Sequence, residues 1–105
     1  MSYYGVYTTK GFDEEVDKLE KIEQERINKL FPKLKENPYV GDPLRYKFFR
    51  EKRINGKRVY FLVFDDLIAV LFVAVSDKKT QQETIDSVLD KLIQFKDYLK
   101  DKLKD

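Results

Sequence analysis

The sequence predicts an α+β domain in which helices pack on a mostly antiparallel sheet, with elements in the order β-α-α-β-β-β-α. Three observations lead to this class. Apolar residues recur at helical spacing between Phe12 and Leu34, and again after Thr80. Asn55 and Gly56 form the dipeptide most typical of a two-residue hairpin turn, and apolar segments of strand length follow it. We expect residues 1–105 to form a single domain of this kind.

The N-terminal part is expected to contain one strand and a helical hairpin. Residues 3–9 are rich in Tyr, Val and Thr, which predicts a strand that ends before Gly11. Residues 12–34 follow helical spacing, but one helix of this length would span roughly 35 Å, more than a domain of this size comfortably covers. We therefore expect two helices with a break near residues 20–24, followed by a loop over residues 37–43.

The middle of the chain predicts an antiparallel three-stranded meander. Residues 46–53 are expected to form its first strand, residues 58–64 its second and residues 68–76 its third. The last two segments are almost uniformly apolar, so these strands should lie at the centre of the sheet or be covered on both faces.

A long C-terminal helix is expected to complete the domain. Thr80 and Glu83 have the spacing of a capping box, which predicts a helix that starts there and reaches the C-terminus. Its apolar residues share one stripe: Ile85, Val88, Leu89, Leu92, Leu99 and Leu103. The first half of the stripe should cover the sheet. The end of the helix, about residues 95–105, is expected to protrude and to offer an interface for a partner helix or for a homodimer.

The composition excludes several classes of chemistry. The chain has no cysteine and no histidine, so it lacks disulfides, a thiolate nucleophile, an imidazole base and the usual zinc ligands. We expect no cofactor and no metal. Charged residues make up 38% of the chain, with the dense Lys and Glu that is typical of thermophiles. The N-terminus is polar and no apolar run is long enough to cross a bilayer, which predicts a cytoplasmic protein that does not bind membranes.

Positive charge is concentrated in residues 45–58. Four of the five arginines lie there with three lysines and one glutamate, which gives a formal charge of +6 in a chain whose net charge is +2. Such a surface suits an anion, and a polyanion above all. An alternative interpretation is that these charges bind nothing. Charged side chains near a hairpin tip are commonly just exposed to solvent, where they protect an edge strand from aggregation. Lys78 and Lys79 form a second basic element after the last strand.

The register of the hairpin places several of these charges together. With Asn and Gly as the two loop residues, Arg53 lies opposite Arg58, and Glu51 lies opposite Tyr60 on the same face. Directly opposed arginines repel each other by up to about 1 kcal/mol. A phosphate between the two guanidinium groups would remove this repulsion, because guanidinium binds phosphate in a bidentate manner.

Several short segments occur in an order that matches a known family. They are Lys33–Tyr39 with Gly41, Pro43 and Leu44, then Phe49–Arg53, Gly56–Tyr60, Val70–Val75 and Lys78–Gln81. Together with the order of strand, helical hairpin and meander, they resemble the RelE/ParE superfamily of toxins from toxin–antitoxin modules, over roughly residues 3–90. The last segment is similar to the HigB-like branch. The resemblance implies a RelE-like fold, and the composition suggests an archaeal or thermophilic member.

The resemblance also implies an activity. Family members with RelE-like activity cleave messenger RNA on the ribosome without a metal: the ribose 2′-hydroxyl attacks the adjacent phosphate, and basic side chains stabilise the developing charge. It therefore implies a toxin that inhibits translation as an mRNA endonuclease, with the ribosome, mRNA and a cognate antitoxin as partners. ParE-like members lack the nuclease residues and act on DNA gyrase. A non-catalytic toxin of that kind, or a catalytically silent RNA-binding protein, is the alternative.

The family pattern matches Arg58, Arg50, Lys52 and Arg53 of this sequence, and the charge and register of the hairpin complete two sets of candidate residues. The catalytic set is Arg58, Arg53, Glu51 and Lys52. The RNA- and phosphate-binding set is Arg45, Lys47, Arg50, Lys57, Tyr60, Lys78 and Lys79. With no histidine, the general base is either Glu51 or a lysine whose pKa is lowered by its cationic neighbours. The sequence departs from the RelE pattern because no aromatic residue follows the last strand until Phe95.

Overall fold

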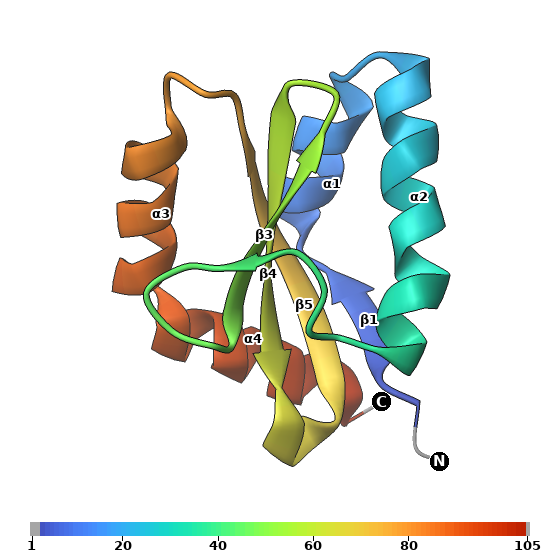
Figure 1. Ribbon diagram of the computed structural model, residues 1–105. Helices are drawn as coiled ribbons and strands as arrows, with labels where there is room; N and C mark the ends of the chain where they lie inside the picture. Colours follow the sequence, from blue (N-terminus) through green and yellow to red (C-terminus); the bar gives the residue numbers. More distant parts are fainter. Residues whose placement is uncertain (1–2, 105) are drawn as a thin grey trace.

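One five-stranded sheet lies between two pairs of helices in the computed structural model, which describes residues 3–104 (Figure 1). The strands are β1 (Gly5–Thr8), β2 (Asp42–Pro43), β3 (Phe49–Ile54), β4 (Lys57–Phe64) and β5 (Ala69–Ser76). The helices are α1 (Lys10–Asp17), α2 (Lys21–Glu36), α3 (Gln81–Asp90) and α4 (Leu92–Leu103), and a short 3₁₀ turn covers Asp65–Leu67. The predicted α+β class is confirmed.

The sheet has the strand order β1-β5-β4-β3-β2. β1 is parallel to β5, and all other neighbours are antiparallel. The predicted meander corresponds to β3, β4 and β5, and its two apolar strands lie at the centre of the sheet as expected. Two details differ from the prediction. β3 begins at Phe49 and not at residue 46, and the segment expected to be a loop contains the two-residue strand β2, which pairs with β3.

The helical hairpin is present, but its break comes earlier than expected. α1 ends at Asp17 and α2 begins at Lys21. The Glu20 amide donates a hydrogen bond to the Glu23 carboxylate at 3.1 Å, which closes a capping box at the start of α2. Gln24 donates from its side-chain amide to the carbonyl of Leu19 at 3.1 Å and so ties the turn to the helix. In the sequence, the Glu-x-x-Glu spacing of Glu20 and Glu23 is the pattern that indicates the start of α2.

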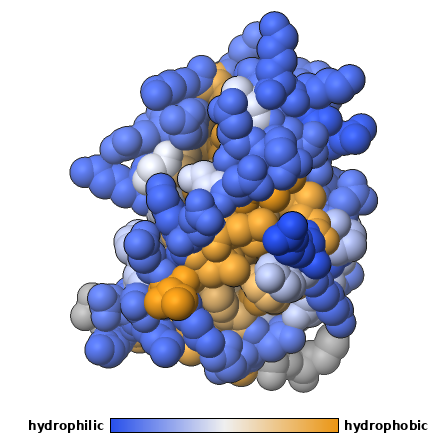
Figure 2. Space-filling view, turned by 90° about the vertical axis from the view of Figure 1, so that its left-hand side faces the viewer, coloured by the Kyte–Doolittle hydropathy of each residue, from blue (hydrophilic) through white to orange (hydrophobic). Residues whose placement is uncertain are grey.

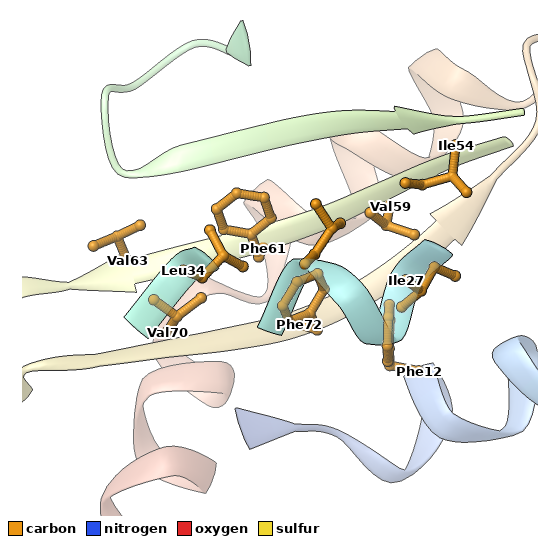
Figure 3. Close-up of a cluster of buried hydrophobic side chains, with 10 residues drawn as sticks. Phe12, Ile27, Leu34, Ile54, Val59, Phe61, Val63, Val70 and Phe72 are labelled. Carbon is orange, nitrogen blue, oxygen red and sulfur yellow. The ribbon is translucent and has the colours of Figure 1, made fainter. Parts of the chain in front are cut away.

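The first core layer packs α1 and α2 on one face of the sheet. Phe72 of β5 lies at its centre, with ring centroids 5.1 Å from each of Phe12, Phe31 and Phe61. Figure 3 shows Phe12, Phe61 and Phe72 among the side chains that converge between the helices and the sheet. The other buried members of this layer are Ile27, Leu30, Leu34, Ile54, Val59, Val63 and Val70.

The second core layer lies on the opposite face, under α3 and α4. Its buried members are Phe49, Tyr60, Leu62, Ala69, Leu71, Val73, Val88 and Leu99. Both faces of β4 and β5 are therefore covered, which explains why these strands are apolar at nearly every position. Within residues 3–104, none of the helices is both long enough and apolar enough to span a bilayer.

The C-terminal helix is split, which the sequence did not indicate. α3 ends at Asp90, Lys91 donates its amide to the Val88 carbonyl at 3.0 Å, and α4 then runs in a new direction across the sheet (Figure 1). Because of this break, Leu99 is completely buried in the second core layer and the described part of α4 does not extend away from the domain. The Lys102 ammonium also donates to the Thr8 carbonyl, at 3.3 Å.

The start of α3 differs from the predicted capping box. The Thr80 side chain makes no hydrogen bond to the helix, because its hydroxyl donates to the Asp77 carboxylate at 3.1 Å. The Thr80 amide donates to the same oxygen at 3.0 Å. These two bonds close a tight turn between β5 and α3 and lower the pKa of Asp77.

Part of the surface around α3 and α4 is apolar and exposed to solvent. Figure 2 shows a band of apolar side chains across this face with polar side chains around it. Beside α4, a cavity of about 550 Å³ is bordered by Phe48, Phe64 and Leu92, and Ile93 is 78% exposed. The expected homodimer or partner helix on the C-terminal helix stays a prediction.

One carboxylate joins three separate segments at the end of the sheet opposite the hairpin turn. The Tyr4 hydroxyl donates to one oxygen of Asp65 and the Tyr39 hydroxyl to the other, each at 2.6 Å. The hydrogen bond from Tyr39 lowers the pKa of Asp65 below its ordinary value, and the bond from Tyr4 adds a smaller effect in the same direction. Burial and the bond to Asp65 raise the pKa of Tyr39 to about 12.

We expect the stabilising effect of Asp65 to depend on pH. Because its pKa is lowered in the folded chain, the effect is complete above the ordinary carboxyl pKa of 3.8 and disappears as the pH falls through the lowered pKa. In urea unfolding, Asp65→Asn should therefore be less stable than the wild type at neutral pH, and the difference should shrink as the pH is lowered below 3.8. A difference that stays constant as the pH falls would contradict this account.

Candidate functional site

The basic hairpin has the register that the sequence predicts. Asn55 and Gly56 occupy the turn with positive φ angles of 48° and 86°. Arg53 pairs with Arg58, and Glu51 pairs with Tyr60. Because side chains alternate along a strand, all four of these residues point to the α3 and α4 side of the sheet, where Phe49 and Leu62 also lie.

At the centre of this face, Arg58 and Glu51 form a buried ion pair. The Arg58 Nε atom lies 3.1 Å from Glu51 Oε1, and the two side chains are only 8% and 5% exposed. Gln81, the first residue of α3, donates from its side-chain amide to the same carboxylate oxygen at 2.7 Å. The start of α3 thus covers the ion pair from the side of the second core layer.

The Arg58 guanidinium retains unused hydrogen-bonding capacity. Its Nε atom is within ion-pair distance of Glu51, but no hydrogen bond from this buried nitrogen is formed among the described residues. This nitrogen is closed to solvent and faces a carboxylate, so an anion could reach Arg58 only at the other two nitrogens of its guanidinium.

A pair of hydroxyl groups lies next to the ion pair. The Tyr60 hydroxyl and the Ser76 hydroxyl are 2.8 Å apart, and both side chains are buried. Burial raises the pKa of Tyr60, although its bond to Ser76 acts in the opposite direction. Ser76 is placed there by its pairing with Arg58 across β4 and β5. We refer to Arg58, Glu51, Tyr60, Ser76 and Gln81 together as the buried polar cluster.

Exposed cations lie near the buried polar cluster at the turn end of the hairpin. Arg53 is exposed opposite Arg58, and Lys57 lies at the start of β4. Lys78 and Lys79 are exposed directly after β5, whose last residue pairs with Arg58. The hairpin end therefore carries three exposed cations near one buried arginine: Arg53, Lys78 and Lys79. Lys57 is half-buried and pairs with Ile54, whose side chain belongs to the first core layer.

Other residues of the candidate set lie elsewhere. Lys52 pairs with Val59 and points to the α1 and α2 side of the sheet. Arg45 and Lys47 lie in the loop before β3, at the far end of that strand, where the Lys47 ammonium is 4.7 Å from the centre of the Tyr39 ring. The structure therefore does not bring Lys52, Arg45 and Lys47 together with the buried polar cluster.

Arg50 lies on the α1 and α2 side of the sheet, where it has a structural role. Its guanidinium is buried and donates to the carbonyl oxygens of Tyr39, Val40, Gly41 and Lys47, at 2.9–3.1 Å. These bonds fix the loop between α2 and β3. All three of its nitrogens are used in this way, so we leave Arg50 out of the phosphate-binding site.

We expect Arg50→Ala to lower the free energy of unfolding by roughly 2–4 kcal/mol, because the loop carbonyls lose a charged donor. Arg50→Lys should recover little of this loss, since an ammonium cannot replace the planar set of donors. Urea unfolding monitored by circular dichroism measures both values. Arg53→Ala is the matched control, and its change should stay within about 0.5 kcal/mol because that side chain is exposed. Equal losses in both variants would contradict the proposed role.

Ser76 and Gln81 are the members of the buried polar cluster that the sequence did not predict. Ser76 is the last residue of an apolar strand, and its position opposite Arg58 depends on the irregular pairing of β4 and β5 at Tyr60 and Phe61. Gln81 reaches Glu51 only because α3 folds back over the sheet. Within residues 3–104, no group of three or more Asp or Glu side chains is arranged to hold a metal ion.

Comparison with solved structures identifies the class of fold. E. coli toxin RelE with two arginine substitutions, in the free state, superposes with a TM-score of 0.67 at 16% identity, covering 84% of this chain and 99% of that one. The toxin–antitoxin complex RelBE2 of Mycobacterium tuberculosis gives 0.63 at 23% identity, covering 74% and 94%. The archaeal RelE–RelB complex of Pyrococcus horikoshii gives 0.62 at 17%, covering 72% and 96%.

Neither the models of known protein families nor the curated protein sequences match this chain. The structural similarities therefore establish the fold. This protein has the RelE-like toxin fold, as the resemblance in its sequence implied.

Proposed function

We propose that this protein is the toxin of a toxin–antitoxin module and acts as a metal-independent, ribosome-associated mRNA endonuclease that inhibits translation. The toxin role is supported by the fold, since similar RelE structures are complexes with antitoxins. A cognate antitoxin is the expected partner. The observation that carries the proposed reaction is the buried pair of Arg58 and Glu51, at the end of the hairpin that carries exposed cations.

In the proposed reaction, Glu51 accepts the proton of a ribose 2′-hydroxyl. The 2′ oxygen then forms a bond to the adjacent phosphorus, and the bond between this phosphorus and the 5′ oxygen breaks. The 5′ oxygen takes a proton from water. The Arg58 guanidinium stabilises the negative charge that develops on the phosphate oxygens. The products are a 2′,3′-cyclic phosphate and a 5′-hydroxyl.

The other residues of the site have supporting roles in this proposal. Arg53, Lys78 and Lys79 bind the flanking phosphates, which carry the electrostatic part of the affinity. The Gln81 amide donates to one carboxylate oxygen of Glu51 at 2.7 Å. In this proposal the second carboxylate oxygen accepts the proton, and Gln81 holds the carboxylate in place.

A non-catalytic role is the second candidate. Arg58 and Glu51 neutralise each other and are almost completely buried, an arrangement that can also be purely structural. Within the described residues, no aromatic side chain follows β5 before Phe95. These observations favour a ParE-like toxin that binds a protein such as DNA gyrase, or a silent RNA-binding protein.

Induced expression in cells, with mapping of mRNA 5′ ends, tests the proposal. The wild type should arrest growth and produce cleavage at fixed positions within codons, and Arg53→Ala/Arg58→Ala should do neither. Lys33→Ala/Lys35→Ala is the matched control, because these exposed lysines lie on α2, away from the site. If the wild type arrests growth without cleaving mRNA, and the double arginine variant still arrests growth, the non-catalytic role is favoured.

A further inference from the structure

The side of β5 that faces β1 is paired with a strand over only half of its length, and α1 lies beside it. β1 pairs with residues Ala69–Phe72 of β5, and the Thr9 amide makes the last bond to it, donating to the Phe72 carbonyl at 3.1 Å. β5 continues through Val73–Ser76, which we call the open edge. On this side the open edge pairs with no strand of residues 3–104. A strand edge of this kind presents unpaired backbone donors and acceptors to a further strand.

A cavity of about 410 Å³ lies along the open edge. Its floor is β5, at Val73, Ala74 and Val75. One wall is α1, which contributes Gly11 and Glu15; the glycine leaves that wall without a side chain. The opposite wall comes from α3 and α4 and includes Glu83, Thr84, Ser87, Val88, Lys91 and Phe95. The cavity is therefore a slot between helices with a strand edge as its floor.

Two of the three helices that border the slot, α1 and α3, are acidic. α1 carries four carboxylates and one lysine, a formal charge of −3. α3 carries three carboxylates and no basic residue, again −3. The Glu15 carboxylate makes one ion pair, with Lys18 at 3.6 Å, but both side chains are more than half exposed and such a pair contributes little. Among the residues that line the slot, Glu15 and Glu83 are acidic and Lys91 is basic, so the lining carries a formal charge of −1. The slot therefore favours cations, in contrast to the basic hairpin.

We propose that the open edge binds an extended, cationic segment of a partner protein, which joins the sheet as a strand in line with β1. Side chains of an added strand alternate between the two faces of the sheet. One row would contact Val88 and Phe95 and should be apolar. The other row would face Gly11 and Glu15 and should carry Lys or Arg. This inference uses neither Arg58 nor Glu51, so it does not depend on the proposed nuclease activity.

The geometry sets the size of the bound segment. The open edge has four residues, which span roughly 13 Å in an extended chain. The Thr9 turn into α1 limits the slot at one end, because α1 begins directly after it. A segment of four to six residues therefore fits the slot, with backbone hydrogen bonds providing affinity and the acidic walls providing selectivity.

A peptide of alternating valine and lysine, eight residues long with blocked termini, is a suitable probe. In NMR titrations of the full chain at millimolar peptide, we expect saturable shifts at Val73–Ser76 and at Gly11, with slower exchange of the edge amides. A peptide with the same side chains but methylated backbone nitrogens cannot pair with a strand edge and should not bind. A peptide of alternating valine and glutamate should bind at least about tenfold more weakly.

Two charge-reversal variants test the walls. Glu15→Lys/Glu83→Lys changes two exposed carboxylates that line the slot, and we expect about tenfold weaker binding of the valine–lysine peptide. Glu14→Lys/Asp86→Lys is the matched control on the same helices, outside the slot lining, and should change the affinity less than about threefold. The proposal is overturned by an absence of shifts at the open edge, by equal binding of the methylated peptide, or by equal losses in both variants.

Discussion

Arg58→Ala is expected to slow cleavage of ribosome-bound mRNA by about 100- to 1,000-fold in a single-turnover assay with purified protein. The proposed mechanism needs a donor aimed at the phosphate oxygens while their charge develops. Arg58 is the buried cation of the site, and its ion pair with Glu51 leaves the other two guanidinium nitrogens for this role. Glu51→Gln should reduce the rate by about 100-fold or more, because an amide cannot accept the proton of the 2′-hydroxyl.

Controls have to separate lost chemistry from lost stability, since removing one partner of a buried ion pair can cost roughly 3–5 kcal/mol. Arg58→Lys keeps the charge beside Glu51 and should remain folded, with activity between that of the wild type and Arg58→Ala. Circular dichroism and unfolding midpoints verify the folded fraction of each variant. A folded Arg58→Ala protein that cleaves as fast as the wild type would remove Arg58 from the mechanism.

Phe72→Ala is expected to give the largest loss of stability, roughly 3–5 kcal/mol in the free energy of unfolding. Phe72 is completely buried at the centre of the first core layer, in contact with three other phenylalanine rings. Alanine would remove this packing and leave a cavity between the sheet and the helices α1 and α2. Urea unfolding measures the loss, and Phe72→Leu should be milder because it retains most of the apolar volume.

The control for this prediction is a truncation at the surface. Ile93 on α4 is 78% exposed, so Ile93→Ala should change the free energy of unfolding by no more than about 0.5 kcal/mol. If Phe72→Ala were as mild as Ile93→Ala, the assignment of Phe72 to the centre of the core would be wrong.

The parts of the fold that were predictable follow from local rules. Asn55 and Gly56 fix a two-residue turn, and a two-residue turn leaves only one register for the hairpin. The break at Lys91 had no such signal, because neither glycine nor proline occurs between Gln81 and Leu103 and the apolar spacing continues across it. The break brings Leu99 against the sheet, and such a tertiary contact is not visible in helical periodicity.

The candidate site shows the same division. Alternation along the hairpin correctly placed Glu51, Arg53, Arg58 and Tyr60 on one face. A count of charges could not distinguish the buried, fully bonded Arg50 from a solvated arginine, because the distinction depends on the path of the preceding loop. The contributions of Ser76 and Gln81 depend on strand pairing and helix docking, so they became visible only in the folded chain.

The chemistry of the cleaved ends is the most direct test of the central claim. Purified wild-type protein is incubated with ribosomes carrying a defined mRNA, and the ends of the products are identified. The mechanism predicts 5′-hydroxyl ends and 2′,3′-cyclic phosphate ends, present with the wild type and strongly reduced with folded Arg58→Lys and Glu51→Gln. The absence of cleavage, or 5′-phosphate ends in its products, would contradict an attack by the 2′-hydroxyl at the buried polar cluster.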